Sequence, residues 1–486
     1  MSGIAWRGGA ELATRLLRIA VFLLLARLLT PEIFGLVALA SVFITVLEHV
    51  ASGGVSQAII HLPNLTRRHL DAAFVLSVSS GVIVGGVVLL GATPLAAWFE
   101  EPMLGPVLMS LSVVPLLSGF TMVPEGLLSR GLQFRALSIR HLVSAVTSIT
   151  VAVVLALLGA GVWALVAQTV VEAVVSAVIL WAVTLREYRP GLRFDGSSAS
   201  EIVTYGSKVL GFDLTTVAST RTDDLLVGSF LGPLQLGLYS VGYKLLMVVR
   251  DSIHTVALAV AFPIFSRLQD DPERAAHGLL RSSSLTLAIC GPLLAFVAAA
   301  SAAVVPFLLG DQWVAAVPIV SVLAIAGIAG IVTDVNNAFL QAQSSAGQVL
   351  AFAVASAVLN VTGFAIAVQH GILWVAVAFA VRSFVTLPVS YLMVHRKVGG
   401  GGRLAAAHVR VMAATGAAVA PCFAIGWLRS TGGSDFLVLL LTASAGLAIY
   451  LVVLRLVAQE TFNDMSGFVG HLVRRATARE REEPEH

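Results

Sequence analysis

Charged residues are scarce in this chain of 486 residues, where Lys, Arg, Asp and Glu together account for 12%. Long polar stretches are missing as well, because every gap between apolar runs is short. With 57% hydrophobic residues, such a chain would expose too much apolar surface as a water-soluble globule. The short gaps also leave no room for a soluble catalytic domain on either side of a membrane, so we do not expect an enzyme.

Cysteines are nearly absent, and a basic patch is absent. Cys290 and Cys422 both lie inside apolar runs, which excludes a disulfide framework or a cysteine metal site, and we expect no cofactor. The net charge is +3, but the basic residues are spread over short loops, which argues against nucleic acid as a partner. The first apolar run carries Arg7, Arg15 and Arg18 and leads into a hairpin, so we interpret it as a retained helix rather than a signal peptide.

What the chain does contain is apolar runs of about 20 residues, the length of a helix that crosses a bilayer. They predict an all-α polytopic membrane protein with about 14 transmembrane helices. The expected spans are 10–29, 35–60, 73–97, 104–128, 139–159, 162–185, 202–228, 237–262, 279–309, 314–340, 348–369, 372–394, 405–428 and 435–457.

Basic residues occur in alternate gaps between these spans. One set of gaps holds Arg67, Arg68, Arg130, Arg135, Arg140, Arg186, Arg189, Arg193, Arg267, Arg274, Arg281, Arg396, Lys397, Arg403 and Arg410. The opposite set has almost no basic residue except Arg429 and includes the acidic gap at 98–104. Because cytoplasmic loops carry the excess of Lys and Arg, we expect both termini in the cytoplasm.

A short motif occurs twice, at one spacing. Leu29, Pro31, Gly35 and Leu36 recur as Leu231, Pro233, Gly237 and Leu238 (231 − 29 = 202). One interpretation is that Pro and Gly simply mark outer turns. The other is two six-helix lobes related by a parallel repeat, a known transporter plan with the site at the repeat interface. The expected domains are then an N-terminal lobe at 1–190, a C-terminal lobe at 200–397, two added spans at 403–458 and a cytoplasmic tail at 459–486.

Several ionisable residues lie inside the expected spans, where a charge must face a cavity or a partner. On the first span, Glu11 can pair with Arg15 at i,i+4, which leaves Arg18 as the most available cation. Polar stripes on the seventh and eighth spans include Asp213, Arg221, Asp223, Asp224, Tyr239, Tyr243 and Arg250, and later spans add Asp334 and Arg382.

Two interpretations of these charges stay open. Arg and acidic residues can neutralise each other as structural pairs between helices. Alternatively, the five central cations Arg15, Arg18, Arg221, Arg250 and Arg382 form a receptor for an anion such as phosphate, which the arginine fork suits. In that case Tyr239 and Tyr243 would hydrogen-bond or stack on sugar rings, and Asp213, Asp224 and Asp334 are candidates for binding a coupling proton or sodium ion.

Four segments resemble the Wzx-type polysaccharide-export flippases of the multidrug/oligosaccharidyl-lipid/polysaccharide exporter superfamily. They are 27–35 (RLLTPEIFG), 53–60 (GGVSQAII), 231–239 (LGPLQLGLY) and 262–268 (FPIFSRL). The resemblance implies two six-helix lobes around a V-shaped cationic cavity, with pyrophosphate contacts from lobe-facing arginines. By position, the candidates for that role are Arg15, Arg18, Arg250 and Arg382.

The same resemblance implies a function. It is a flippase of the bacterial inner membrane that moves an undecaprenyl-pyrophosphate-linked oligosaccharide to the periplasmic leaflet by alternating access, for surface polysaccharide biosynthesis. The implied partners are this glycolipid and the lipid bilayer, with the polysaccharide polymerase and glycosyltransferases of the same pathway as further candidates.

Four other functions are alternatives to this one. A multidrug or cation extruder of the same superfamily would need an acidic, aromatic cavity, and a lipid II flippase would use the same chemistry as the proposed one. A membrane glycosyltransferase, polymerase or ligase would need a sizeable outer loop, which this chain lacks. A non-transporting scaffold of a glycan-synthesis complex leaves the intramembrane cations unexplained.

Overall fold

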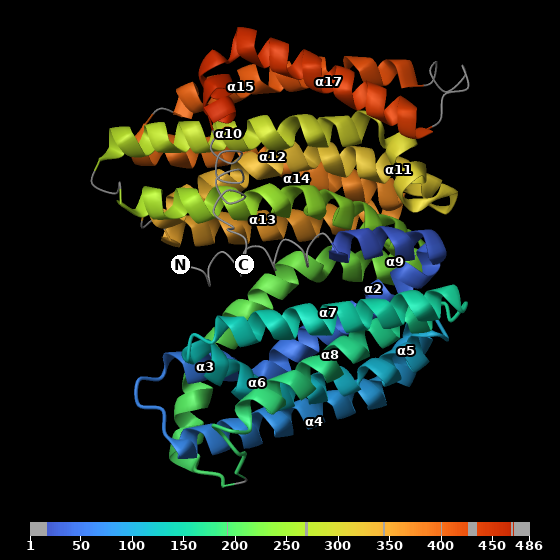
Figure 1. Cartoon of the computed structure of the whole chain (residues 1–486), viewed down its shortest axis with the longest axis vertical. Helices are drawn as coiled ribbons and strands as arrows, with labels where there is room; N and C mark the ends of the chain where they lie inside the picture. Colours follow the sequence, from blue (N-terminus) through green and yellow to red (C-terminus); the bar gives the residue numbers. More distant parts are fainter. Residues whose placement is uncertain are drawn as a thin grey trace, which may run out of the picture. The chain divides into compact units, whose positions relative to one another are not determined.

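The computed structural model describes residues 17–191, 193–267, 271–343, 346–399, 401–425, 435–467 and 470. Its regular structure over these ranges is helical throughout (Figure 1). Twelve helical segments in the described part are long and apolar enough to cross a membrane. The predicted class, an all-α polytopic membrane protein, is therefore confirmed.

The number of spans stays a prediction. The first expected span, 10–29, begins outside the described residues, and helix is described from residue 17 to residue 28. One of the twelve segments, Arg221–Arg250, runs across Gly232, where two expected spans meet. Gly232 has φ 79° and ψ 175°, values that interrupt the helix there.

The helices gather into two compact units, Met1–Ser240 and Val241–His486. This division falls later in the chain than the boundary expected between 190 and 200, and the domain boundaries remain a prediction. The long helix α9 (Gly196–Arg267) contributes its first part to unit 1 and continues into unit 2.

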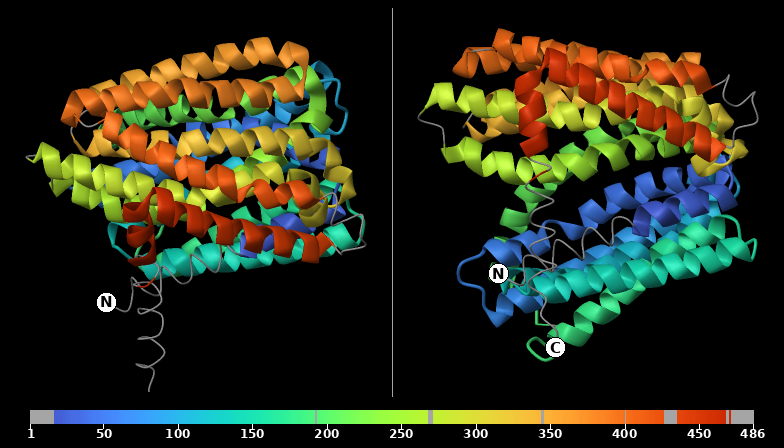
Figure 2. Two further views of the ribbon diagram at one scale, coloured as in Figure 1. Left: turned by 90° about the horizontal axis from the view of Figure 1, so that it is seen from above. Right: turned by 45° about the horizontal axis from the view of Figure 1, so that its top comes forward.

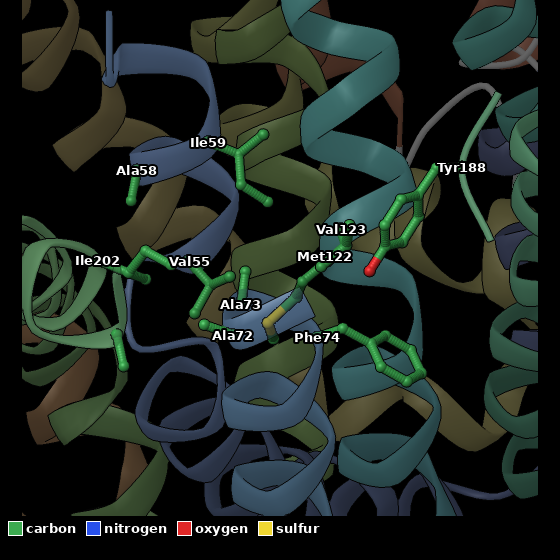
Figure 3. Packing of buried hydrophobic residues seen from close by; sticks show 11 residues of the cluster. Val55, Ala58, Ile59, Ala72, Ala73, Phe74, Met122, Val123, Tyr188 and Ile202 are labelled. Atoms are coloured by element: carbon green, nitrogen blue, oxygen red, sulfur yellow. The ribbon is translucent and has the colours of Figure 1, made fainter. Parts of the chain in front are cut away.

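Unit 1 is a bundle in which α7 packs along α8 and α4 packs along α6. Its elements before α9 are α2 (Pro31–Ser52), α3 (Val55–His61), α4 (Arg67–Trp98), α5 (Leu104–Leu111), α6 (Val113–Arg130), α7 (Phe134–Leu157) and α8 (Val162–Thr184). A core under α3 joins α4, α6 and the start of α9 through the residues shown in Figure 3, with Phe74 and Tyr188 on one side and Ile202 on the other.

One expected span, 35–60, is broken into α2 and α3. Gly53 and Gly54 lie between them with φ values of 49° and 67°, in the left-handed region that glycine enters without steric cost. A Cβ on Gly54 would lie 2.7 Å from the carbonyl oxygen of Gly206 in α9. Hydropathy does not register this break, because both sides of it are equally apolar.

Unit 2 is built around α12, which packs against α10 and α14. After α9 it contains α10 (Pro272–Ala299), α11 (Ser301–Leu309), η1 (Asp311–Ala316), α12 (Val317–Ala342), α13 (Ala346–Ala367), η2 (Val368–His370), α14 (Ile372–Val398), α15 (Gly401–Ala418), η3 (Ala420–Ala424) and α17 (Asp435–Val457). The helices of the two added spans, α15 and α17, pack on each other, and α15 packs on α10 (Figure 2, orange and red).

The two copies of the repeated motif lie against each other within unit 1. A Cβ placed on Gly35 would collide with the carbonyl group of Pro233, and a Cβ on Gly237 would collide with that of Pro31. The contact is reciprocal, since Pro31 and Gly35 occupy the same motif positions as Pro233 and Gly237. Glycine is therefore required at both positions for the backbones to approach this closely.

We predict that Gly35→Ala destabilises the protein by about 1–3 kcal/mol, the usual range for overpacking, because a backbone carbonyl cannot move aside as a side chain can. Thermal unfolding of the purified protein in detergent measures the effect. The matched control is Gly86→Ala in α4, where a Cβ would meet nothing within 4 Å. Equal unfolding midpoints for the two variants would contradict the close approach.

Candidate substrate-binding residues among the membrane helices

Arg18 forms an ion pair across unit 1. Its Nη2 atom donates to Glu172 Oε1 of α8 at 2.7 Å, with the two side chains 51% and 36% exposed. Arg18, the cation expected to be the most available on the first span, therefore has an acidic partner on another helix, and its role stays a prediction. The sequence argument considered partners on the same helix only, and Glu172 lies 154 residues away. Glu11 and Arg15, the pair expected on the first span, lie outside the described residues.

A second arginine extends this group of charges. Arg140 of α7 is 7% exposed and donates to Glu125 Oε1 at 3.3 Å and to Ser176 Oγ at 3.2 Å. Its neighbour His141 lies within electrostatic range of both ion pairs, Arg18–Glu172 and Arg140–Glu125. Five ionisable side chains from four helices thus form one network in unit 1.

The sequence analysis missed Arg140 and counted it with the cytoplasmic loops. The signal was present, because Arg140, Ser144 and Ser148 follow one another at a spacing of four residues and share one face of a helix. All three are buried in α7. An arginine near the end of a span agrees with the excess of Lys and Arg in cytoplasmic loops, so Arg140 was not among the expected intramembrane charges.

In unit 2, Arg250 of α9 pairs with Asp334 of α12. Its Nε donates to Asp334 Oδ2 at 2.8 Å, and its Nη2 donates to the same oxygen. The two side chains are 25% and 22% exposed. Polar residues expected on the eighth and tenth spans therefore meet in the structure.

An aromatic group is also present in unit 2. The rings of Tyr243 and Phe379 lie edge to face with centroids 5.8 Å apart. The guanidinium carbon of Arg382 lies 4.6 Å from the centroid of the Phe379 ring, within the range of a cation–π contact. Phe379 and Arg382 share one face of α14, since they are three residues apart.

The acidic residues of α9 in unit 1 have different partners. Arg221 Nη1 donates to Asp224 Oδ2 at 3.2 Å, and Tyr239 Oη donates to Asp223 Oδ2 at 3.0 Å. Tyr239 is fully buried, so in this structure it contacts protein rather than solvent. Asp213 is partly buried on the same helix. Among the described residues, no group of three His, Cys, Asp or Glu side chains is placed to hold a metal ion.

The segment that joins α8 to α9 is anchored to unit 1 by Asp71 of α4. Asp71 Oδ1 accepts hydrogen bonds from Tyr188 Oη at 3.1 Å and from the Gly191 amide at 3.0 Å. Burial, followed by the nearby Asp71 carboxylate, raises the pKa of the Tyr188 hydroxyl. Asp195 directly precedes α9, and hydrogen bonds from Ser198 and Ser197 lower the pKa of its carboxyl to about 2.

Together these observations define a class: a multi-pass membrane protein whose helices hold ion-paired arginines. A family model described as "Polysaccharide biosynthesis protein" matches residues 24–318, which is more than half of the chain. The chain belongs to this polysaccharide biosynthesis family.

Two curated relatives agree with this assignment. The teichuronic acid biosynthesis protein TuaB of Bacillus subtilis is 27% identical, over 79% of this chain and 80% of its own length. The succinoglycan biosynthesis transport protein ExoT of Rhizobium meliloti is 25% identical, over 66% of this chain and 65% of its own length. One relative is named for biosynthesis and the other for biosynthesis and transport, and neither name is that of an enzyme.

Solved structures show the same fold. The lipid II flippase MurJ, in an inward closed conformation, superposes with a TM-score of 0.73 at 13% identity, covering 94% of this chain and 99% of that one. An inward-facing multidrug transporter of the MATE family gives a TM-score of 0.61 at 16% identity, covering 80% of this chain and 96% of that one. At these identities the likeness concerns the fold alone.

We predict that Arg250 and Asp334 stabilise each other measurably. Removing one partner leaves an uncompensated charge among apolar helices. The single variants Arg250→Gln and Asp334→Asn should therefore each lower the free energy of unfolding, and the sum of the two losses should exceed the loss in the double variant. The coupling free energy in a double-mutant cycle, measured by thermal unfolding, is expected to be about 0.5–3 kcal/mol. The exposed pair Arg274–Asp271 is the matched control, and little coupling is expected there. Additive effects at Arg250 and Asp334 would contradict the assignment.

Proposed function

We propose that this protein is a flippase of the bacterial inner membrane that moves an oligosaccharide linked to undecaprenyl pyrophosphate from the cytoplasmic to the periplasmic leaflet. Membership of the polysaccharide biosynthesis family and similarity to a named transport protein support a role in moving a glycan precursor. The proposed orientation has both termini in the cytoplasm, in agreement with the basic residues of alternate gaps.

The observation that carries the proposal is that two arginines inside the apolar helices are paired with carboxylates. Arg18 is held by Glu172, and Arg250 by Asp334. A diphosphate oxygen offers the same acceptor chemistry as a carboxylate oxygen and a higher charge. Such pairs can therefore exchange a protein acid for a substrate phosphate without leaving a guanidinium unsatisfied.

Arg18 and Arg250 are our candidates for the phosphate contacts, each within its own unit. Arg18 is half exposed and donates one hydrogen bond to Glu172, so its other N–H groups face away from that acid. Arg250 donates from Nε and Nη2 to one oxygen of Asp334, so it already binds an anionic oxygen with two donors. Arg15, Arg221 and Arg382 are proposed as further cationic residues, and Tyr239 and Tyr243 as glycan contacts in other states of the cycle.

Alternating access supplies the proposed mechanism. The anionic headgroup exchanges into the arginine pairs from the cytoplasm, while the lipid tail stays in the bilayer. An electrical potential negative inside favours outward movement of an anion by about 2.3 kcal/mol per charge per 100 mV. The carboxylates Asp213, Asp224 and Asp334 were the first candidates for a coupling ion, but Asp224 and Asp334 already hold arginines in this structure.

A multidrug extruder of the same fold is less well supported. Binding of an organic cation requires carboxylates that are not already neutralised by protein cations, and three of the acids inside the helices, Glu172, Glu125 and Asp334, each face an arginine. The fold does not distinguish a flippase from a multidrug extruder, since a lipid flippase and a drug transporter share it.

We predict that Arg250→Glu abolishes transport of a labelled lipid-linked glycan in proteoliposomes, to the level of protein-free vesicles. The reversed charge both repels the pyrophosphate and faces Asp334. The double variant Arg250→Glu with Asp334→Arg restores an ion pair and should recover folding more fully than transport, because the cation then sits on the other helix.

The matched control is Arg281→Glu, at a pair with Asp464 in which the arginine is 71% exposed. This variant should keep its transport. Full transport by Arg250→Glu, with the protein present at wild-type level, would rule out the proposed phosphate contact.

A further inference from the structure

Asp223 is a buried carboxylic acid in the membrane region that the ion pairs do not explain. It lies in the first part of α9 and is 7% exposed. Its Oδ2 accepts a hydrogen bond from Tyr239 at 3.0 Å, and its Oδ1 accepts one from the Asp224 amide at 3.0 Å. Among the described residues, both carboxyl oxygens therefore have neutral partners.

The cation nearest in the sequence belongs to another acid. Arg221 donates to Asp224, three residues along the helix. In the described part of the chain, no arginine, lysine or histidine comes within ion-pair distance of the Asp223 carboxylate. The charged group that acts on it is Asp224, an acid, and the titratable side chain in contact is Tyr239.

The helix packed on this part of α9 brings no charge to the site. Leu39 of α2 contacts the position of Gly228, where a Cβ would lie 2.7 Å from a methyl carbon of Leu39. Between Glu32 and Glu48, α2 has no ionisable residue. Arg221, Asp223 and Asp224 together thus carry one net negative charge if both acids are ionised, with no counter-charge from α2.

The depth of Asp223 makes that charge costly. It precedes the turn at Gly232 by nine residues, which corresponds to about 13 Å of helix at 1.5 Å per residue. Tyr239 follows Gly232 by seven residues, so the hydrogen bond joins the two arms of a helical hairpin, which belong to the expected spans 202–228 and 237–262. An ionised carboxylate at such a depth needs a partner cation or water.

We propose that Asp223 is a proton-binding site, where Oδ2 carries a proton while the hairpin is closed on Tyr239 and loses it when the carboxyl reaches water. Proton uptake converts the carboxylate to a carboxylic acid by forming one O–H bond, and release returns the same proton to water. In the protonated state, the Asp223 O–H and the Tyr239 hydroxyl can each donate to the other at the observed distance.

This site couples transport to a proton gradient, a step that rests on the proposed function. Protons move inward down their gradient through Asp223 while the glycolipid moves outward. The residue differs from the three acids considered from the sequence, because Asp224 and Asp334 are neutralised by arginines and Asp213 is less buried.

Asp71 provides a matched control of the same local chemistry. It also accepts hydrogen bonds from a tyrosine hydroxyl and a backbone amide, and it is similarly buried. However, it lies four residues after Arg67, the first residue of α4, where charge is readily compensated.

Infrared spectroscopy of the full-length protein in detergent tests proton binding without any substrate. At neutral pH, the wild type is expected to show the carbonyl stretch of a protonated carboxyl, which Asp223→Asn should lose and Asp71→Asn should retain. Tyr239→Phe keeps the acid and should shift the band to higher wavenumber, since a hydrogen bond is lost. A spectrum without this band in the wild type, or with it in Asp223→Asn, would overturn the proposal.

Proteoliposomes test the coupling separately, with a fluorescent polyprenyl-pyrophosphate-linked disaccharide as the probe. One pH unit of gradient should raise wild-type product accumulation about tenfold for each coupled proton. The Asp223→Asn variant should exchange the probe without responding to the gradient. Wild-type transport that does not depend on the pH gradient would refute the coupling but not the flippase proposal. Absence of any wild-type transport would refute the flippase proposal, and proton binding by Asp223 would then be decided by the infrared result.

Discussion

The cost of placing a charge among apolar helices governs the polar interior of this protein. Arg18, Arg140, Arg221 and Arg250 are each held by a carboxylate, and the bonds cross between helices in three of the four cases. A guanidinium removed from water needs an acceptor for its donors and a counter-charge for its field, and one acid supplies both. These pairs therefore fix which helix faces meet, while the apolar side chains around them fill the space. Polar residues inside a bilayer are expensive, which is why each of these arginines needs an acceptor close by.

Backbone contact is the second constraint, and it acts where side chains are absent. At Gly35 and Gly237 two helix starts approach so closely that a methyl group would not fit, and at Gly54 and Gly206 the same is true near the opposite end of α2. Packing of this kind relies on van der Waals contact rather than on the hydrophobic effect, which is weak between helices already surrounded by lipid. The two glycine contacts hold α2 against the first part of α9 near both ends. The polar residues of that part of α9, among them Asp223, lie between the two contacts.

Much of this architecture could be predicted from the sequence, because span length and loop charge are local properties. The helices α4, α7, α8, α13, α14 and α17 begin and end close to the expected spans. The break at Gly53 was invisible to hydropathy, since it depends on the backbone angles that glycine permits. The partners of the arginines could not be predicted, because Arg18 and Glu172 are 154 residues apart and Arg250 and Asp334 are 84 apart. Helical spacing finds only partners on the same helix, so Arg221 with Asp224 was accessible and the others were not. The same spacing would have revealed Arg140, Ser144 and Ser148 as a buried stripe if the topology rule had not already accounted for the arginine.

The proposed exchange of ion pairs would also limit how tightly an anionic substrate can bind. Each phosphate oxygen that takes the place of Glu172 or Asp334 gains only the difference between two charge-assisted hydrogen bonds, not the full strength of one. The displaced carboxylate must then find water or another cation, which lowers the net affinity further. Weak binding of this kind suits a transporter, since a site that held the substrate firmly in one state would release it slowly in the next. Arg18 is the more exposed of the two arginines and has the more exposed acid, so its exchange involves the smaller loss of contacts. Arg140 belongs to the same network and is deeply buried, so in the proposed exchange it is the better placed of the two to keep the helices together.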